Sequence, residues 1–539
     1  MKLIRCFLIA VIQFYLSTCL AQAGSLAPDL KARLERVSPS ERLRVIVRMD
    51  KEADISVFPR GQREVMVKYL QNFAAASQRD LLASLPRYGD KVSRVSRFWI
   101  YNGISLVATK DVILDLVLRP DVGSIEESKT ISLEPLTAED APAITGVEWN
   151  ISRIQADRVW RELGYTGQGI VIGNIDSGVM ATHETFGGRW RGGNNSWFDA
   201  VNDSTHPYDD YGHGTWTMGI ACGGSTADSI GVAPGARFVA AKAIDSNGIF
   251  TYEWMDSCFQ WYASLGAEAP HVINNSYGWG VGGTFFWQQT RNLQIMGIHQ
   301  VCANGNLGPN PGTVTSPAGY PHLFGVGAST FEDTVPTRSS RGPSPQFGAM
   351  ESTVNYLDTN WALSRRKPDL VAPGLYIRSS DTTGGYSVGS GTSASAPHVA
   401  GVIALMLQKN PDLTDKQIWK ILTSTCDTFS WGGPYPNQNY GWGRLNAYRA
   451  VLATPPSGVS EEAAQSPVSR LLFSVFPNPF VSFTAIPGHA SERFALYDIT
   501  GRKVGMYKGD RVGEGLSAGV YFLRPEGKNA KPLRIVKVR

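Results

Sequence analysis

The spacing of apolar positions changes twice along the chain and divides it into three regions. In residues 24 to about 135, short apolar stretches predict strands at 43–49 and 97–108. Amphipathic stretches in the same region predict helices at 63–85 and 110–118. This pattern is typical of a small α+β domain.

From residue 154 to about 453 the chain carries short, almost wholly apolar runs that alternate with helical patterns. The runs cover residues 169–175, 237–244, 271–275, 298–303 and 323–327. Strands of this kind are buried on both faces, as in a mostly parallel sheet that is covered by helices on either side. The central region is therefore predicted to be an α/β domain.

Two stretches without a clear period separate these regions and read as linkers. Residues 128–145 are rich in Thr, Ala, Glu and Pro, and residues 454–469 are rich in Pro, Ser, Glu and Ala. A short β-rich module follows the second linker. Its strand candidates lie at residues 473–476, 494–497, 520–523 and 535–538.

The first 23 residues have the features of a secretory signal peptide. Lys2 and Arg5 precede an apolar run over residues 6–20, and a small-residue site at 21–23 follows it. The run is short for a membrane-spanning helix. We therefore expect cleavage after Ala23 and a location outside the cytoplasm.

Composition and charge narrow the class of protein. The 539 residues include 56 Gly and 31 Pro, and only 18% are charged, which is unlike a coiled coil or a helical repeat array. The net charge is +4, but residues 140–470 hold 20 basic and 26 acidic side chains. Binding of nucleic acid needs clustered cations, so this mildly acidic region argues against such a partner.

Four cysteines remain once the signal segment is removed, and two readings of them stay open. They are Cys222, Cys258, Cys302 and Cys426. In an exported protein they could form two disulfides in three pairings, or they could be four separate buried thiols. The absence of a CxxC spacing gives no indication of metal or redox chemistry.

Three short blocks in the central region each present one reactive side chain. Asp176 follows an apolar strand, His213 lies between two glycines at a helix start, and Ser393 opens a long apolar helix. Each alone has an ordinary structural explanation: an Asx turn, a structural histidine or a helix cap. Together, in the order Asp, His, Ser, they predict nucleophilic catalysis, because a serine hydroxyl needs an adjacent base that is held in a fixed tautomer.

These blocks resemble the motifs of the subtilisin-like serine proteases, the subtilase family, over residues 145 to 453. The similarity extends to the segments 231–234, 339–343 and 367–374. The resemblance implies a subtilisin-like fold with Ser393 as nucleophile, His213 as general base and acid, and Asp176 as the group that orients the histidine. It implies no organic cofactor. Ala394 stands where the family usually has Met.

The same resemblance implies an oxyanion hole and a substrate cleft. Asn306 would donate from its side chain to the oxyanion, in preference to Asn304, and the Ser393 N–H would be the second donor. Substrate would add as a strand along Ser276, Tyr277 and Gly278. Leu307 and Thr315 complete the implied first specificity pocket, for a large apolar residue.

The implied calcium chemistry is less well matched. Many subtilases bind structural calcium, but Thr185 stands where the family has an Asp, and the loop at 223–231 does not match clearly. We expect no metal at this position, although loop oxygen ligands elsewhere would leave little trace in a sequence.

The flanking regions also resemble known modules. Residues 24–135 are similar to the inhibitory propeptide of the family, which implies self-cleavage near residues 128–140; an unrelated N-terminal binding domain is the alternative. The C-terminal region carries three blocks at 475–480, 495–504 and 516–523 and ends in a short basic strand at 534–539. In this order they resemble the sorting domain of type IX secretion in Gram-negative bacteria, with an ordinary β-sandwich adhesion module as the alternative for residues 471–539.

The resulting hypothesis is a secreted or cell-surface serine endopeptidase that is exported across the outer membrane and matures by propeptide cleavage. Its partners would be protein or peptide substrates, its own propeptide and the secretion machinery. The domains are predicted at 1–23 (signal), 24–135 (propeptide), 140–453 (catalytic), 454–470 (linker) and 471–539 (a β-sandwich-like sorting module). The rival reading is a catalytically silent surface-binding protein on the same scaffold. An esterase is a weaker rival because no Gly-x-Ser-x-Gly elbow is found at Ser390.

Overall fold

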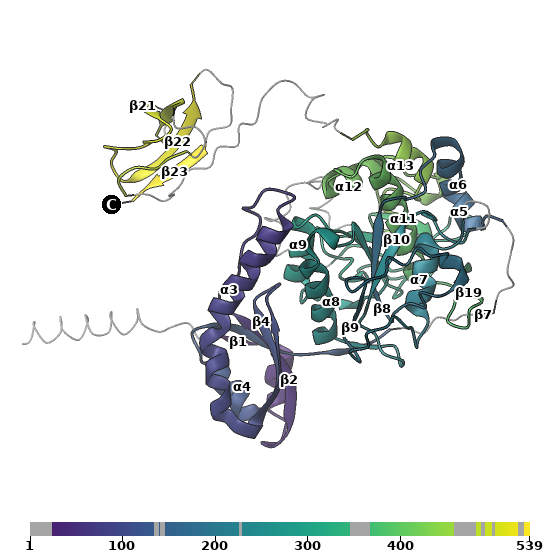
Figure 1. The fold of residues 1–539 in the computed structure, drawn as a ribbon, viewed down its shortest axis with the longest axis horizontal. Coiled ribbons are helices and arrows are strands. Elements are labelled where there is room, and N and C mark those ends of the chain that lie inside the picture. Colours follow the sequence, from purple (N-terminus) through teal and green to yellow (C-terminus); the bar gives the residue numbers. More distant parts are fainter. Residues whose placement is uncertain are drawn as a thin grey trace, which may run out of the picture. The chain divides into compact units, whose positions relative to one another are not determined.

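The computed structural model describes most of the chain as two compact units, Met1–Ser457 and Gly458–Arg539. The described residues are 24–133, 139–140, 146–225, 229–344, 367–457, 481–486, 491–498, 502–526 and 533–538, and the side chains of 139, 140, 525, 533 and 534 are not described. The predicted signal segment and the strand candidate at 473–476 lie outside these residues. Figure 1 shows the fold.

The N-terminal part of the first unit is a five-stranded sheet in the order β1-β5-β2-β4-β3 with helices packed against it. Its elements are β1 Ser25–Leu26, α2 Pro28–Leu34, β2 Arg42–Met49, α3 Arg63–Ser84, β3 Val92–Phe98, β4 Gly103–Thr109, α4 Lys110–Val117 and β5 Val122–Glu127. The predicted strand at 43–49 and both predicted helices are confirmed. The single strand predicted at 97–108 is wrong: a turn containing Asn102, with φ of 57°, divides it into β3 and β4, which pair antiparallel.

A seven-stranded sheet in the order β17-β16-β14-β12-β8-β10-β9 forms the centre of the same unit, and every described pairing in it is parallel. Its strands are β8 Val171–Asp176, β9 Trp197–Asp199, β10 Arg237–Lys242, β12 Val272–Asn275, β14 His299–Ala303, β16 Phe324–Ser329 and β17 Leu370–Pro373. The five predicted strands are all present.

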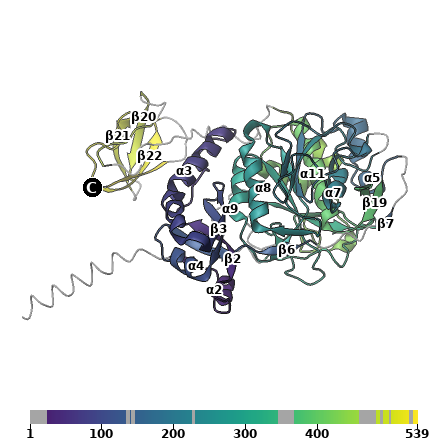
Figure 2. The ribbon, with the colours of Figure 1, turned by 60° about the horizontal axis from the view of Figure 1, so that its bottom comes forward.

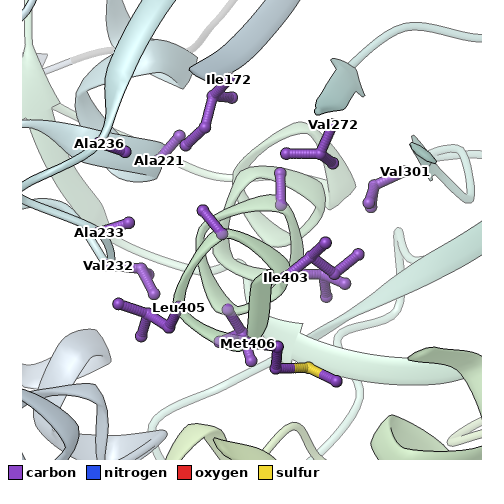
Figure 3. Close-up of a cluster of buried hydrophobic side chains, with 14 of the residues drawn as sticks. Ile172, Ala221, Val232, Ala233, Ala236, Val272, Val301, Ile403, Leu405 and Met406 are labelled. Atoms are coloured by element: carbon purple, nitrogen blue, oxygen red, sulfur yellow. The ribbon is translucent and has the colours of Figure 1, made fainter. Parts of the chain in front are cut away.

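Helices cover both faces of this sheet, as the alternating strand residues require. On one face, the strand residues Ile172, Val272 and Val301 pack against α11 (Thr392–Lys409), whose side chains include Ile403. Figure 3 shows these strand side chains around the helix. On the other face, strand residues from β8, β10, β12 and β14 pack against α8 (Tyr252–Ser264) and α9 (Trp287–Ile295). Figure 2 shows α8 and α9 on the side of the N-terminal sheet.

Around this core lie shorter elements that complete the unit. They are β6 Thr130–Ser132, β7 Glu139–Asp140, α5 Trp149–Arg153, α6 Ala156–Arg158, α7 His213–Cys222, β11 Ile249–Thr251, β13 Trp279–Val281, β15 Thr315–Ser316, β18 Ile377–Ser380, β19 Tyr386–Gly389, α12 Asp415–Ser424 and α13 Ala447–Ala453. The linker predicted at 128–145 is only partly a linker, because β6 pairs with β11 and β7 pairs with β19.

The second unit contains a four-stranded antiparallel sheet in the order β21-β20-β22-β23. Its strands are β20 Arg493–Tyr497, β21 Lys503–Lys508, β22 Gly519–Pro525 and β23 Leu533–Lys537. Phe494, Leu496, Leu523 and Ile535 form its small core. The described residues give one sheet here, so the predicted sandwich is not established by them.

The four cysteines in the described part of the chain are buried free thiols, so the disulfide reading is not what the structure shows. Burial raises the pKa of Cys222 and of Cys302 to about 12, which keeps both thiols protonated and unreactive. Among the described helices, none has the length and the apolar character needed to cross a bilayer.

Candidate active site

Asp176 and His213 meet at the carboxyl edge of the central sheet. Asp176 is the last residue of β8, and His213 is the first of α7, where Gly212 adopts a φ of 97° before the helix. The His213 Nδ1–H donates to both carboxylate oxygens of Asp176, at 2.8 and 2.9 Å. Both side chains are 1% exposed. Because Nδ1 carries the proton, the neutral ring keeps a lone pair at Nε2 and can act as a base there.

Two aspartates that precede His213 hold this corner in place. The Asp209 carboxylate accepts from the Gly212 and Thr215 N–H groups, both at 2.8 Å, and so caps α7. Asp210 pairs with the ammonium of the buried Lys242. Both carboxylates are therefore occupied by contacts within the protein that hold the start of α7 in place.

Ser393 lies in the first turn of α11, directly after the extended strand β19. Its side chain is 9% exposed, and its hydroxyl donates to the Ser276 carbonyl at 2.9 Å. In the part of the chain that the structure describes, no hydrogen bond joins Ser393 to His213. The Ser393 hydroxyl is thus bonded to the Ser276 carbonyl and not to the His213 ring.

Asn306 lies beside the start of α11. Its Oδ1 accepts from the Thr392 N–H at 3.0 Å and from the Thr392 hydroxyl at 3.1 Å. Two donors on the oxygen fix the amide, so its NH₂ group faces the other way, near Gly391 and the chain that leads to Ser393. Asn304 is fully buried and donates to the Ser340 carbonyl, so it is not available at the cleft.

Of the residues predicted for the first specificity pocket, some are placed where they could line it, whereas the ring of Tyr277 is not. Gly278 and Thr315 lie together, because a Cβ on Gly278 would be 2.3 Å from the Thr315 hydroxyl, and Leu307 is 47% exposed at the surface. Tyr277 does not offer its ring to a pocket. It is 1% exposed, packs among core aromatics and donates its hydroxyl to Asn275. Any contribution of Tyr277 to the pocket must therefore come from its backbone.

The histidine nearest to Ser393 in the sequence has a different role. His398 is fully buried, with its Nδ1 bonded to the Ala394 carbonyl and its Nε2 to Asn150, both at 2.8 Å. Burial lowers its pKa to about 4, so it is neutral and structural.

The surroundings of Thr185 do not fit a calcium ion. A pocket of about 380 Å³ lies there and is lined by Arg189 and Arg378 as well as Glu184. The Arg189 guanidinium donates to the Thr185 carbonyl, so a cationic group already occupies this oxygen. In the described residues, no group of three His, Cys, Asp or Glu side chains is arranged for a metal.

The chain is similar to one protein family and to several known proteins. A family model described as the subtilase family matches residues 167–443. Bacillopeptidase F of Bacillus subtilis (strain 168) is 33% identical over 429 residues, which are 73% of this chain and 29% of that protein. Subtilisin E of the same strain is 30% identical over 394 residues, which are 72% of this chain and 91% of that protein.

A solved structure was also found. The crystal structure of a cold-adapted subtilisin-like serine proteinase matches with a TM-score of 0.45 and 29% identity, over 56% of this chain and 98% of that one. The chain spans under a third of bacillopeptidase F but nearly all of subtilisin E. The family model alone covers half of the chain, and the chain therefore belongs to the subtilase family of serine-type endopeptidases.

Proposed function

We propose that this protein is a secreted endopeptidase that cleaves peptide bonds through an acyl-enzyme on Ser393 and that is made as a self-inhibited precursor. The observation that carries the proposal is the buried Asp176–His213 hydrogen bond at the same sheet edge as the start of α11. A base with a fixed tautomer is what a serine nucleophile requires.

In the proposed reaction His213 Nε2 takes the Ser393 proton while Oγ attacks the substrate carbonyl. The protonated His213, stabilised by Asp176, then gives this proton to the amine that leaves as the peptide bond breaks. Water attacks the acyl-enzyme in the second half, with His213 again as base, and returns Ser393 to its starting form.

The oxyanion would be held by the Asn306 amide and by the Ser393 N–H. The first N–H groups of a helix have no acceptor within the helix, and the positive end of its dipole lies there. The fixed orientation of Asn306 supports its role, because a donor that is already in place loses no free energy to reorganisation during the reaction.

Substrate specificity is proposed from the side chains around Gly278. Gly278 and Thr315 provide a small surface, and the exposed Leu307 adds an apolar one. We expect a large apolar residue before the cleaved bond. A peptide library in which charged residues dominate at that position would contradict this expectation.

Residues 24–133 are proposed to act as the inhibitory propeptide, because they pack tightly on the catalytic part. Arg63, at the start of α3, donates to the carbonyls of Met296, Gly266 and Gly297 at 2.7 to 3.2 Å. These three carbonyls lie just beyond the C-terminal ends of α8 and α9. Arg48 donates to the Phe285 carbonyl at 2.6 Å. Hydrogen bonds from charged groups of this kind contribute about 1.5 to 3 kcal/mol each.

The two short strands that follow suggest where the precursor is cut. β6 pairs antiparallel with β11, and the Leu133 N–H donates to the Gly248 carbonyl at 2.7 Å. β7 pairs with β19, the strand that leads into Ser393. The chain thus pairs with β11 before residue 134 and with β19 after residue 138. We place the cleaved bond between Leu133 and Glu139, within the range expected from the sequence.

Export is proposed from the ends of the chain. Lys2, Arg5 and the apolar run at 6–20 favour a signal peptide. The C-terminal unit, with its own small core, is proposed to be the secretion module. Deleting residues 458–539 should leave proteolysis intact and keep the protein inside the cell envelope.

The proposal is tested by expressing residues 24–539 as wild type and as Ser393→Ala. The wild type should shorten itself between Leu133 and Glu139 and digest casein, and mass spectrometry follows both. The variant should do neither while keeping the same fold. Two intact, inert chains that are nonetheless folded would instead support the silent scaffold.

A further inference from the structure

We infer that four buried polar side chains, Asn174, Thr217, Asn274 and Ser276, are positioning residues that fix the Ser393 backbone relative to the Asp176 carboxylate. We call these four residues the amide relay. The inference rests on the proposed function and deepens it, because it assigns roles to residues behind the reacting atoms.

The strand register brings the relay together. Asn174 lies on β8, two residues before Asp176. Asn274 lies on β12, two residues before Ser276, which directly follows that strand. The two strands are parallel neighbours in which Asn274 is opposite Asn174. Since strand side chains alternate between faces, both amides lie on the face that carries the Asp176 side chain. Each is 1% exposed.

One half of the relay runs from Asn274 to the carboxylate. Asn274 Nδ2 donates to Asn174 Oδ1 at 3.0 Å, and Asn174 Nδ2 donates to the Thr217 hydroxyl at 3.1 Å. The Thr217 hydroxyl lies within hydrogen-bond distance of two acceptors, Asp176 Oδ2 at 3.3 Å and the Gly214 carbonyl at 3.2 Å. Asn174 Nδ2 also reaches that carbonyl at 3.3 Å with its second proton, which leaves the Thr217 proton for Asp176. Thr217 is on α7, one turn after His213, so it approaches the carboxylate from the same helix.

The other half runs from Asn274 to the nucleophile. Asn274 Nδ2 uses its second proton on the Ser276 hydroxyl at 2.9 Å, and this hydroxyl donates to the Ser393 carbonyl at 2.9 Å. In a continuous helix, the N–H of residue 397 would bond to that carbonyl. Pro397 has no N–H, so the Ser276 hydroxyl supplies the missing donor.

A single assignment of protons satisfies the whole relay. The two protons of Asn274 point in opposite directions along it, toward Asp176 and toward Ser393. Every link lies in the interior, where Thr217 and Ser276 are both fully buried. Buried polar groups of this kind are costly unless fully paired, and fully paired networks hold one geometry. The relay therefore fixes the spacing on which proton transfer between Ser393 and His213 depends.

The decisive test uses a matched pair at Thr217 in the full chain of residues 24–539. Thr217→Val keeps the shape and removes the hydroxyl, whereas Thr217→Ser keeps the hydroxyl. We expect Thr217→Val to lower kcat at least 10-fold with KM changed less than threefold, and Thr217→Ser to recover most of the loss. The pH profile of kcat should also move, because an Asp176 carboxylate that accepts one hydrogen bond fewer interacts more strongly with the His213 ring.

Ser276→Ala tests the other end. It should slow the reaction of Ser393 with a fluorophosphonate about 10-fold. The double variant Thr217→Val, Ser276→Ala should lose less than the product of the single losses, because either change already breaks the relay. Asn446→Ala is the control. This amide is 1% exposed, caps α13 and lies outside the relay, so its loss should lower the melting temperature and leave kcat and the pH profile unchanged.

The inference would be overturned if Thr217→Val kept the kcat and pH profile of the wild type. It would also be overturned if the loss in the double variant equalled the product of the losses in the two single variants. A folded wild type without turnover would instead refute the proposed function. In that case the proton resonance of His213 Nδ1–H still reports on the relay. It should shift in Thr217→Val and stay in place in Thr217→Ser and Asn446→Ala, and an unchanged resonance in Thr217→Val would refute the relay.

Discussion

Replacing Asn306 or its neighbour Thr392 tests how the proposed oxyanion hole is built. The Asn306 amide is oriented by two hydrogen bonds to its oxygen, from the Thr392 N–H and hydroxyl. The Thr392 hydroxyl also accepts from the Gly305 N–H at 3.1 Å and so ties the segment before Asn306 to α11. Asn306→Ala removes the donor itself, and Thr392→Val removes only part of its support.

The two variants should differ in magnitude. Loss of one oxyanion donor costs about 10² to 10³ in kcat, or about 2.7 to 4 kcal/mol. Thr392→Val loses two neutral hydrogen bonds of about 1 kcal/mol each, and the Thr392 N–H still holds the amide. Its kcat should therefore fall by at most about 30-fold, and Thr392→Ser should recover most of this loss.

Steady-state hydrolysis of a chromogenic peptide gives kcat and KM for each variant. KM should stay within about threefold in all of them, because the donor acts on the transition state and less on bound substrate. Active-site titration with a fluorophosphonate corrects for inactive protein. A kcat of Asn306→Ala within threefold of wild type would refute the assignment of this side chain to the oxyanion, as would a Thr392→Val variant slower than Asn306→Ala.

Three further results are expected. Asp176→Asn should lower kcat about 10⁴-fold at an unchanged melting temperature, because His213 then loses the acceptor that fixes its tautomer; a loss under 10-fold would contradict the orientation argument. Burial beneath the N-terminal sheet raises the pKa of Asp256 on α8 to about 7 from its ordinary value near 3.8, although the Arg48 guanidinium opposes this shift. The packed state thus binds a proton more tightly than the unfolded chain, so stability should fall as pH rises from about 4 to 7. Asp256→Asn in the Ser393→Ala chain should remove this dependence in urea denaturation at pH 5 and 8. Leu405→Ala, in the fully buried centre of α11, should lower the free energy of unfolding by about 2 to 5 kcal/mol, whereas a similar loss in the exposed Leu452→Ala would point to a cause other than core packing.

The sequence by itself determined the central architecture and the choice of reactive residues. Apolar runs of five to eight residues between helical patterns predict a parallel sheet, because only a doubly covered strand tolerates apolar side chains on both faces. No single block singled out its side chain among eight histidines and many serines. The three blocks together, in the order Asp, His, Ser, and their resemblance to the subtilases pointed to His213 and Ser393. Each of these runs and blocks depends on residues close together in the chain, so it can be recognised from the sequence alone.

Orientation and pairing over long separations were decided by the tertiary structure. Whether Tyr277 faces a cleft or the core depends on neighbours such as Phe250 and Trp279, and only the fold brings these rings together. The strands β6 and β7 lie in a stretch where apolar residues have no regular spacing, so the sequence did not predict them. They form because β11 and β19 supply hydrogen-bond partners from elsewhere in the chain.

The amide relay shows the same division most clearly. Asn174 and Asn274 are a hundred residues apart, and each alone is an ordinary polar residue at the end of a strand. Their contact requires that β8 and β12 be neighbours in one particular register, which is set by the packing of the whole sheet against α11 and α8. Sequence patterns fix the period of a strand and so which side chains share a face, whereas the register between strands depends on the total burial that each alignment achieves, which is a property of the folded molecule.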